Sequence, residues 1–174
     1  DAAKYPEDIP GYGARAWCRS EYFIFSLWNE MQPEVGEVQL YAITDDGGLH
    51  QYPAVKVEGE RYMPSGGDLS NPADKQIIQE LEGRMVEAYG NALIWKLCAA
   101  DKEVDLTAKM IRPVHAAALT AAAAEHGVEA LKLDWNSLGS EGAVAVVAPL
   151  LQAAPTLRSL RWVLRWVVVA LEVV

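Results

Sequence analysis

Hydrophobic residues in the second half of the chain first alternate with polar ones and then follow a helical period. Leu131 and Leu133 lie on either side of one residue, and Asn136 and Leu138 complete the spacing LxLxxNxL. Alternate side chains lie on the same face of a strand. Beyond Gly139, apolar residues recur at the spacing of a helix. The pattern predicts a short strand, a turn in which the Asn136 amide can bond to main-chain groups, and a helix.

The same pattern recurs on both sides of this unit. Shifting the chain against itself by one period aligns Leu106 with Leu133, and a similar shift in the other direction aligns Leu160 with Leu131. The outer units are more degenerate, because basic residues stand at their asparagine position. These two residues are Lys109 and Arg165. Self-similarity at a fixed period is the signature of a repeat protein, in which each unit buries its apolar face against its neighbours.

A strand–helix unit with this motif and a period of about 27 to 29 residues resembles the ribonuclease-inhibitor type of leucine-rich repeat. The resemblance covers roughly residues 104–162. It implies a short solenoid of strands and full helices, and it implies protein recognition, because such repeats bind proteins. The residues that carry the repeat motif are Leu131, Leu133, Asn136, Leu138 and Gly139.

The last residues of the chain, 162–174, are apolar and rich in valine. The segment is shorter than the ~20 residues that a membrane helix needs, so we predict no membrane span. An exposed apolar strand edge promotes aggregation. We therefore expect this segment to cover the last repeat, either by folding back or by pairing with another chain. The expected interface residues are Trp162, Val163, Trp166, Val167, Val169 and Val173.

The N-terminal part of the chain follows other patterns. Residues 1–13, rich in proline and glycine, predict an irregular arm. Residues 14–31 predict a helix that is apolar around much of its circumference, and so buried on more than one side. A short apolar strand is expected over 38–43, of the kind found inside a sheet. A second strand, 49–57, follows a turn and is interrupted by Pro53.

A second helix is predicted after a loop that ends near residue 70. Ser70 or Asn71 can cap it, and Pro72 suits the first helical position. Gly90 is a natural stop, although the helical pattern continues over 93–98. The expected apolar stripe is Ile77, Ile78, Leu81, Met85 and Tyr89, and the expected solvated face is Glu80, Glu82 and Glu87. A composition change over 99–103 predicts a boundary between a region 14–100 and a repeat segment 101–174.

The sequence RAWCRSE at residues 15–21, with the helix and strand that follow it, resembles the WCxxE helix and next strand of Toll/interleukin-receptor (TIR) domains. The resemblance implies a parallel sheet wrapped by helices. In enzymatically active members, a glutamate of this helix takes part in cleaving NAD. That residue would be Glu21, with Trp17 and Cys18 as packing residues. The first strands of such a domain would precede residue 14, where only a short arm stands, so we interpret Glu21 as a surface or structurally paired residue.

Composition narrows the classes of function. The net charge of the 174 residues is -9, which disfavours nucleic-acid binding because phosphate neutralisation needs a basic surface. The cysteines, Cys18 and Cys98, form neither a disulfide framework nor a metal motif, and no signal peptide is visible. We therefore expect an intracellular, reducing compartment. We interpret Cys18, Trp95 and Trp162 as packing residues, and His50, His115 and His126 as structural or solvated, with no metal site.

Together these patterns predict an α/β protein, with a partial TIR-like α/β region followed by a short leucine-rich-repeat solenoid segment. The expected function is a non-enzymatic protein–protein interaction module, a scaffold or accessory subunit of a larger eukaryotic assembly. It would bind protein partners through the repeat face and the apolar C-terminal segment, and it would need no cofactor. The alternative is a TIR-like NAD-cleaving hydrolase, or its inactive remnant, with Glu21 as the carboxylate.

Overall fold

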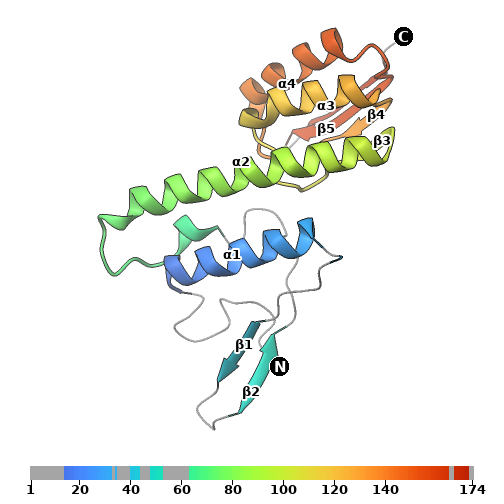
Figure 1. Ribbon diagram of the computed structural model, residues 1–174. Helices are drawn as coiled ribbons and strands as arrows, with labels where there is room; N and C mark the ends of the chain where they lie inside the picture. The colour runs from blue at the N-terminus through green and yellow to red at the C-terminus, as the bar shows by residue number, and fades with distance from the viewer. Residues whose placement is uncertain are drawn as a thin grey trace. The chain divides into compact units, whose positions relative to one another are not determined.

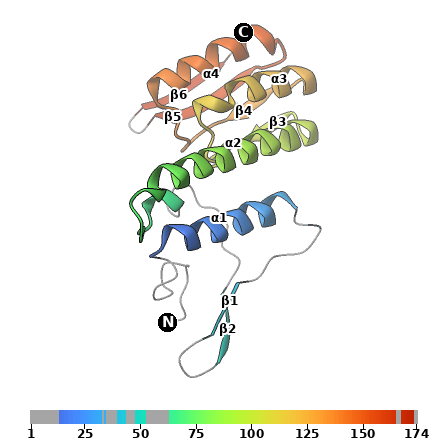
Figure 2. The same ribbon diagram turned by 60° about the vertical axis from the view of Figure 1, so that its left-hand side comes forward.

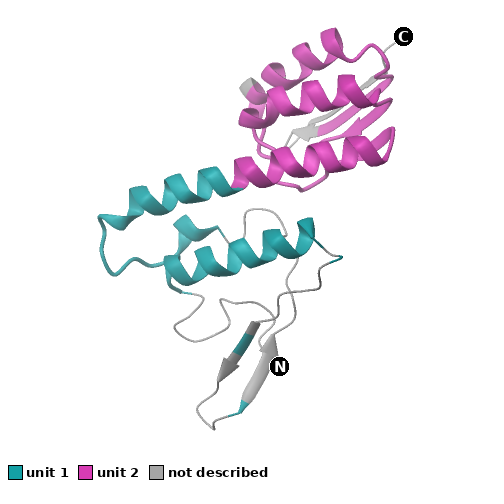
Figure 3. Ribbon diagram, in the orientation of Figure 1, with its two compact units in different colours: residues 1–85 teal, residues 86–174 magenta. Residues whose placement is uncertain are grey.

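The computed structural model describes residues 14–32, 34, 40–43, 48–52, 63–164 and 167–172 (Figure 1). The protein mixes helices and strands and contains a small parallel three-stranded arrangement, in agreement with the predicted α/β class. Its residues form two compact units, 1–85 and 86–174 (Figure 3). The division falls inside helix α2 (Asp74–Ala100), and so before the boundary expected over 99–103.

Unit 1 contains α1 (Ala16–Met31), β1 (Leu40–Ile43), β2 (Leu49–Tyr52) and η3 (Pro64–Gly66). The strand expected inside a larger sheet instead pairs antiparallel with its neighbour in a two-stranded sheet, with Ile43 opposite Leu49. Strand β1 therefore does not belong to a parallel sheet of the kind that the TIR resemblance implies. Val38 and Pro53, on which two of the strand predictions depend, lie outside the described residues.

Helix α1 buries only one side, contrary to the expectation from its many apolar residues. Ala16, Ser20 and Leu27 are buried, whereas Trp17 and Trp28 are 44% and 48% exposed. The chain before α2 approaches the helix start closely, because a Cβ on Gly67 would lie 2.6 Å from the Ala16 nitrogen. This approach is to the main chain of Ala16, and the buried side of α1 carries small and large residues alike, Tyr22 and Phe23 among them.

The Asn71 Oδ1 accepts a hydrogen bond from the Ala73 N–H at 3.1 Å, as in a helix cap. Helix α2 begins only at Asp74, however, so Asn71 and Pro72 lie in the turn before the helix and not at the predicted cap and first helical positions. The expected faces are partly wrong. Ile77 is 54% exposed, and Glu82 is buried at 8% because its carboxylate accepts the Ser65 N–H of η3 at 2.8 Å. Gly90 does not stop the helix, which continues to Ala100.

Unit 2 contains the end of α2, β3 (Glu103–Asp105), η4 (Pro113–His115), α3 (Ala116–His126), β4 (Ala130–Lys132), α4 (Gly139–Ala153), β5 (Ser159–Leu164) and β6 (Val167–Glu172). The sheet order is β3-β4-β5-β6, with the first three strands parallel. Val104 pairs with Leu131, and Leu131 pairs with Leu160. These partners are the residues that the same two shifts align when the sequence is compared with itself.

Turn η4 lies between two glycines of unit 2. A Cβ on Gly90 of α2 would lie 2.4 Å from the His115 Nε2, and a Cβ on Gly142 of α4 would lie 2.5 Å from a Pro113 carbon. The fully buried His115 accepts the Arg112 N–H on Nδ1 at 2.8 Å, and its Nε2 lies 3.1 Å from the Val86 oxygen. The ring therefore joins α2 to η4, which explains why the second half of α2 belongs to unit 2.

The apolar C-terminal segment folds back on its own chain, one of the two expected possibilities. Strand β6 pairs antiparallel with β5, from Ser159 opposite Glu172 to Leu164 opposite Val167. Trp162 is only 9% exposed, so it belongs to the core as one interpretation had it, and it is not a free interface residue. Val163, Val167 and Val169 are members of these two strands, and Trp166 and Val173 lie outside the described residues.

Helices α3 and α4 lie on the same side of the sheet in both views of unit 2 (Figures 1 and 2). The largest fully buried side chains of unit 2 lie between these layers and include Leu106, Ile111, Leu119, Leu131, Leu133, Leu150 and Leu160. Among the described residues, no helix is long and apolar enough to cross a membrane.

Candidate functional site: the exposed face of the parallel sheet

One face of the β3–β5 sheet is buried and the other faces solvent. Along the strands the inward residues Val104, Leu131 and Leu160 alternate with exposed residues, and Lys132 and Arg161 are among these. Parallel sheets are usually covered on both faces. Helices α3 and α4 lie on the same side of this sheet (Figure 2), and the side chains that the three strands direct to the other side are exposed. We call this surface the sheet face.

The strands that carry the sheet face are joined by the same main-chain hydrogen bonds at each step. The Leu106 N–H donates to the Lys132 oxygen at 2.9 Å, and the equivalent Leu133 N–H donates to the Arg161 oxygen at 2.8 Å. The Lys102 oxygen likewise accepts two N–H groups from the next unit, and so does the equivalent oxygen of Glu129. The sheet face is therefore built from structurally equivalent units on a rigid frame.

Asn136 fixes the turn that follows β4. Its amide donates to the main-chain oxygens of Leu106 and Leu133 at 2.7 and 3.0 Å, and its Oδ1 accepts the Ile111 N–H at 2.9 Å. These groups belong to the turn itself and to the preceding unit. Because loops carry main-chain groups that need partners, one side chain here satisfies the turns of two units at once.

Charged side chains form a row across the three strands. Asp105, Lys132 and Arg161 occupy the same position of β3, β4 and β5. The Lys132 Nζ lies 3.7 Å from the Asp105 Oδ2, and both side chains are more than half exposed, so this pair adds little stability. Hydrogen bonds from Thr107, and then the charge of Lys132, lower the pKa of Asp105.

Arg161 also pairs with a carboxylate that is removed from water. Its Nε lies 2.7 Å from the Oδ2 of Asp134, which is only 2% exposed. Removing one partner of such a pair leaves a buried charge uncompensated. Arg161 therefore stabilises the fold through its pair with Asp134. Within the described part of the chain, Lys132 pairs only with the exposed Asp105, so a partner can bind the Lys132 side chain without disturbing the fold.

Trp135 is the most exposed large hydrophobic residue among those described, at 71%. Its φ of 58° lies in the left-handed region, as does the φ of 56° at Ala108, the equivalent residue of the preceding unit. This conformation costs a non-glycine residue roughly 1–2 kcal/mol. Trp135 was not among the candidate residues selected from the sequence. The sequence signal that could have identified Trp135 is its position directly before Asn136, where the repeat motif does not specify the residue.

The motif residues predicted from the sequence lie together in unit 2. Leu131, Leu133 and Leu138 are buried, and Gly139 begins α4 with a φ of 61°. Glu21 belongs to unit 1 and is exposed on α1. The Glu21 carboxylate is therefore open to water. NAD cleavage would instead need this carboxylate in a shaped, water-poor site.

The remaining candidate residues do not form a reactive centre. Cys18 is half-buried rather than fully packed, and Trp95 is 37% exposed, with its ring edge-to-face with His126 at 5.6 Å. Burial raises the pKa of Cys98 to about 11. Within the described ranges, no group of three or more histidine, cysteine, aspartate or glutamate side chains could hold a metal ion.

The sheet face offers a lysine and carboxylates, and the turn that follows β4 adds the exposed Trp135. Aromatic and charged side chains in such an arrangement can bind another protein by burying the ring and pairing the charges. Comparisons of the chain with protein-family models, with curated proteins and with solved structures found no match.

Proposed function

We propose that this protein is a non-enzymatic protein–protein interaction module, a scaffold or accessory subunit of a larger assembly, that binds its partner through the sheet face. The observation that carries the proposal is the exposure of Trp135, at 71%, in a left-handed conformation in the turn that follows β4 and its last residue Lys132. Tryptophan is enriched among the residues that dominate interface energies. An indole this exposed, on a strained backbone, contributes little burial to this fold, so a partner is the reason we give for it.

We further propose that the two strand–helix units of unit 2 are leucine-rich repeats of the ribonuclease-inhibitor type. The strand register supports this, because the residues that pair across the sheet are those that the sequence motif aligns. The Asn136 hydrogen bonds to two successive units support it as well. In such a stack, the face lined by parallel strands is the surface left free for a partner.

An affinity purification with matched variants tests the proposal. The full chain, immobilised as bait, is incubated with native extract, and bound proteins are quantified by mass spectrometry. Trp135→Asn removes the indole and keeps a residue that tolerates positive φ. Lys132→Glu reverses the exposed charge. We expect each variant to lose at least tenfold of one stoichiometric partner that the unaltered chain retains.

Two controls separate the sheet face from other exposed residues. Val144 of α4 is 69% exposed and Arg84 of α2 is also exposed, and neither belongs to the sheet face. Val144→Asn and Arg84→Glu should retain the partner. Equal retention by all four variants, each folded by circular dichroism, would remove the sheet face as the binding surface.

A further inference from the structure

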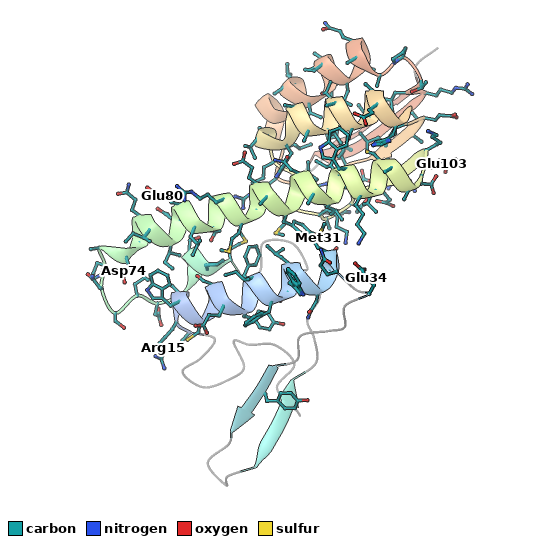
Figure 4. All side chains as sticks on the ribbon, viewed as in Figure 1. Arg15, Met31, Glu34, Asp74, Glu80 and Glu103 are labelled. Carbon is teal, nitrogen blue, oxygen red and sulfur yellow. The ribbon has the colours of Figure 1, made fainter. Side chains whose placement is uncertain are left out.

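Helix α1 exposes large apolar side chains to solvent. Trp17, Ile24, Phe25 and Trp28 are 44%, 45%, 44% and 48% exposed. An ordinary surface helix directs its larger apolar residues inward. The buried side of α1 does carry Tyr22, Phe23 and Leu27, but these four large apolar side chains remain on the exposed side. The helix is bracketed by the labelled Arg15 and Met31 in Figure 4. Contiguous exposed apolar residues of this kind mark binding surfaces.

A carboxylate lies in the middle of these residues. At 100° per residue, Trp17, Glu21, Ile24 and Trp28 fall within an arc of about 60° on the helix. We call these four residues the α1 stripe. Glu21 is exposed, and the Trp17 Nε1 donates to the Asp74 Oδ2 at 3.1 Å, which holds that indole in place. An occupant of the stripe would contact two indoles and would enclose the Glu21 carboxylate.

The carboxylate and the charge of unit 1 narrow the class of occupant. Two antiparallel copies of the stripe would bring their Glu21 carboxylates within about 5 Å along the helix axis, where they repel. Residues 1–85 contain 7 basic and 15 acidic residues, a net charge of -8. Anionic lipid headgroups repel such a unit. Both a second copy and a membrane surface are therefore disfavoured, and a cationic protein segment is favoured.

We propose that the α1 stripe binds a basic amphipathic helix of a partner protein. Its apolar residues cover Trp17, Ile24 and Trp28, and its lysine or arginine pairs with Glu21. Burial of the carboxylate without a cation would be costly, so the cation is required for the apolar contact to form. The indole faces also attract cations. This binding is independent of the sheet face.

The probe is a fluorescein-labelled 18-residue peptide of leucine and lysine, with leucine at helical spacing. Its matched controls are a scrambled peptide of the same composition and an analogue with glutamate in place of lysine. Fluorescence anisotropy with the full chain measures affinity. We expect the leucine–lysine peptide to bind at least tenfold more tightly than either control. Glu21→Lys and Trp28→Ala should each weaken that binding at least tenfold.

Two variants distinguish the stripe from other exposed surfaces. Ile77→Ala removes a residue that is 54% exposed on α2, and Lys132→Glu alters the sheet face. Both should bind the peptide like the unaltered chain, so the proposal can fail while the sheet-face proposal stands. Absence of binding, equal binding of the scrambled peptide, or unchanged affinity in both Glu21→Lys and Trp28→Ala would overturn it. Loss of binding in Lys132→Glu alone would also overturn it, and so would binding of phosphatidylserine vesicles, measured without the peptide, that Trp28→Ala abolishes.

Discussion

The Asn136 amide donates a hydrogen bond to the main-chain oxygen of Leu106, which lies 2.7 Å away and belongs to the preceding strand–helix unit. The same side chain accepts the Ile111 N–H, so it bonds to both ends of the loop that leaves β3. The Leu106 oxygen also accepts the Lys109 N–H of its own loop at 3.3 Å, and the Ala108 N–H donates to the Asp134 oxygen at 2.9 Å. The Asn136 amide therefore reinforces a join between the two turns that the main chain also makes.

Replacing Asn136 with alanine should lower the free energy of unfolding by about 2–4 kcal/mol, because it leaves several partly buried main-chain groups without partners. Asn136→Asp keeps an acceptor for the Ile111 N–H but places a carboxylate against the Leu106 and Leu133 oxygens. We expect the aspartate variant to be at least as destabilised as the alanine variant. Urea denaturation followed by circular dichroism measures both, and a loss below about 0.5 kcal/mol in either would contradict this role.

The strand register of unit 2 could be predicted from the sequence because the repeat period fixes it. Leu131 aligns with Val104 and Leu160 in the sequence, and the same residues pair in the sheet. An apolar residue in one unit must meet the equivalent residue of the next to close the core. The turn before α2, in which Asn71 accepts a hydrogen bond from a nearby N–H, could also be predicted from neighbouring residues, although the helix begins later than the predicted cap.

Contacts between distant segments could not be predicted in this way. The local sequence predicts that Gly90 ends the helix, but the helix continues to Ala100. The glycine is there because the His115 ring, distant in sequence, lies too close for a Cβ. Trp17 and Trp28 were expected to be buried because of their residue type, but the buried side of α1 is the one that carries Phe23. Trp135 was missed because the motif fixes only the inward residues and leaves the outward ones free.

Gly90→Ala tests the contact between α2 and η4. Alanine in place of glycine inside a helix ordinarily stabilises it by about 1 kcal/mol. Here the new Cβ would lie 2.4 Å from the His115 Nε2, so the ring or the helix must move. We expect a net loss of about 1–3 kcal/mol in the free energy of unfolding, measured by urea denaturation.

Gly83→Ala is the matched control in the same helix, because a Cβ there meets no atom within 4 Å. We expect Gly83→Ala to stabilise the protein by about 0.5–1 kcal/mol. If both variants were stabilised to the same extent, the Gly90–His115 contact would not constrain the fold.

The two cysteines should react at very different rates with a thiol reagent. Burial raises the pKa of the Cys98 thiol to about 11, so only about one in a thousand Cys98 thiols is ionised at pH 8. Cys18, in α1, is only half-buried, so the reagent can reach its thiol. With Ellman's reagent at pH 8, we expect one rapid equivalent in the native chain and two in urea. Cys18→Ser should abolish the rapid equivalent and Cys98→Ser should keep it. Two equally rapid native thiols would be inconsistent with a buried Cys98.

His115 should make the stability of unit 2 fall as the pH drops below about 6.5. Burial lowers the pKa of His115 below its usual 6.5, and protonation of Nδ1 would displace the hydrogen bond from the Arg112 N–H. Below pH 6.5 the unfolded chain therefore binds more protons at this site than the folded one. Its contribution to stability is complete above 6.5 and is lost as the pH falls toward the lower, folded-state pKa, with a slope of at most about 1.4 kcal/mol per pH unit.

Urea denaturation at half-unit steps from pH 5 to pH 7.5 measures this slope. His115→Gln can still accept from Arg112 or donate to Val86 and does not titrate, so we expect it to flatten the profile even if it lowers stability at every pH. His126→Gln, at the end of α3, keeps His115 and should keep the slope. The change in slope, rather than the change in stability, identifies His115, because any buried replacement can destabilise the fold but only loss of its titration removes the pH dependence. A profile of unchanged slope in His115→Gln would assign the acid sensitivity to other groups.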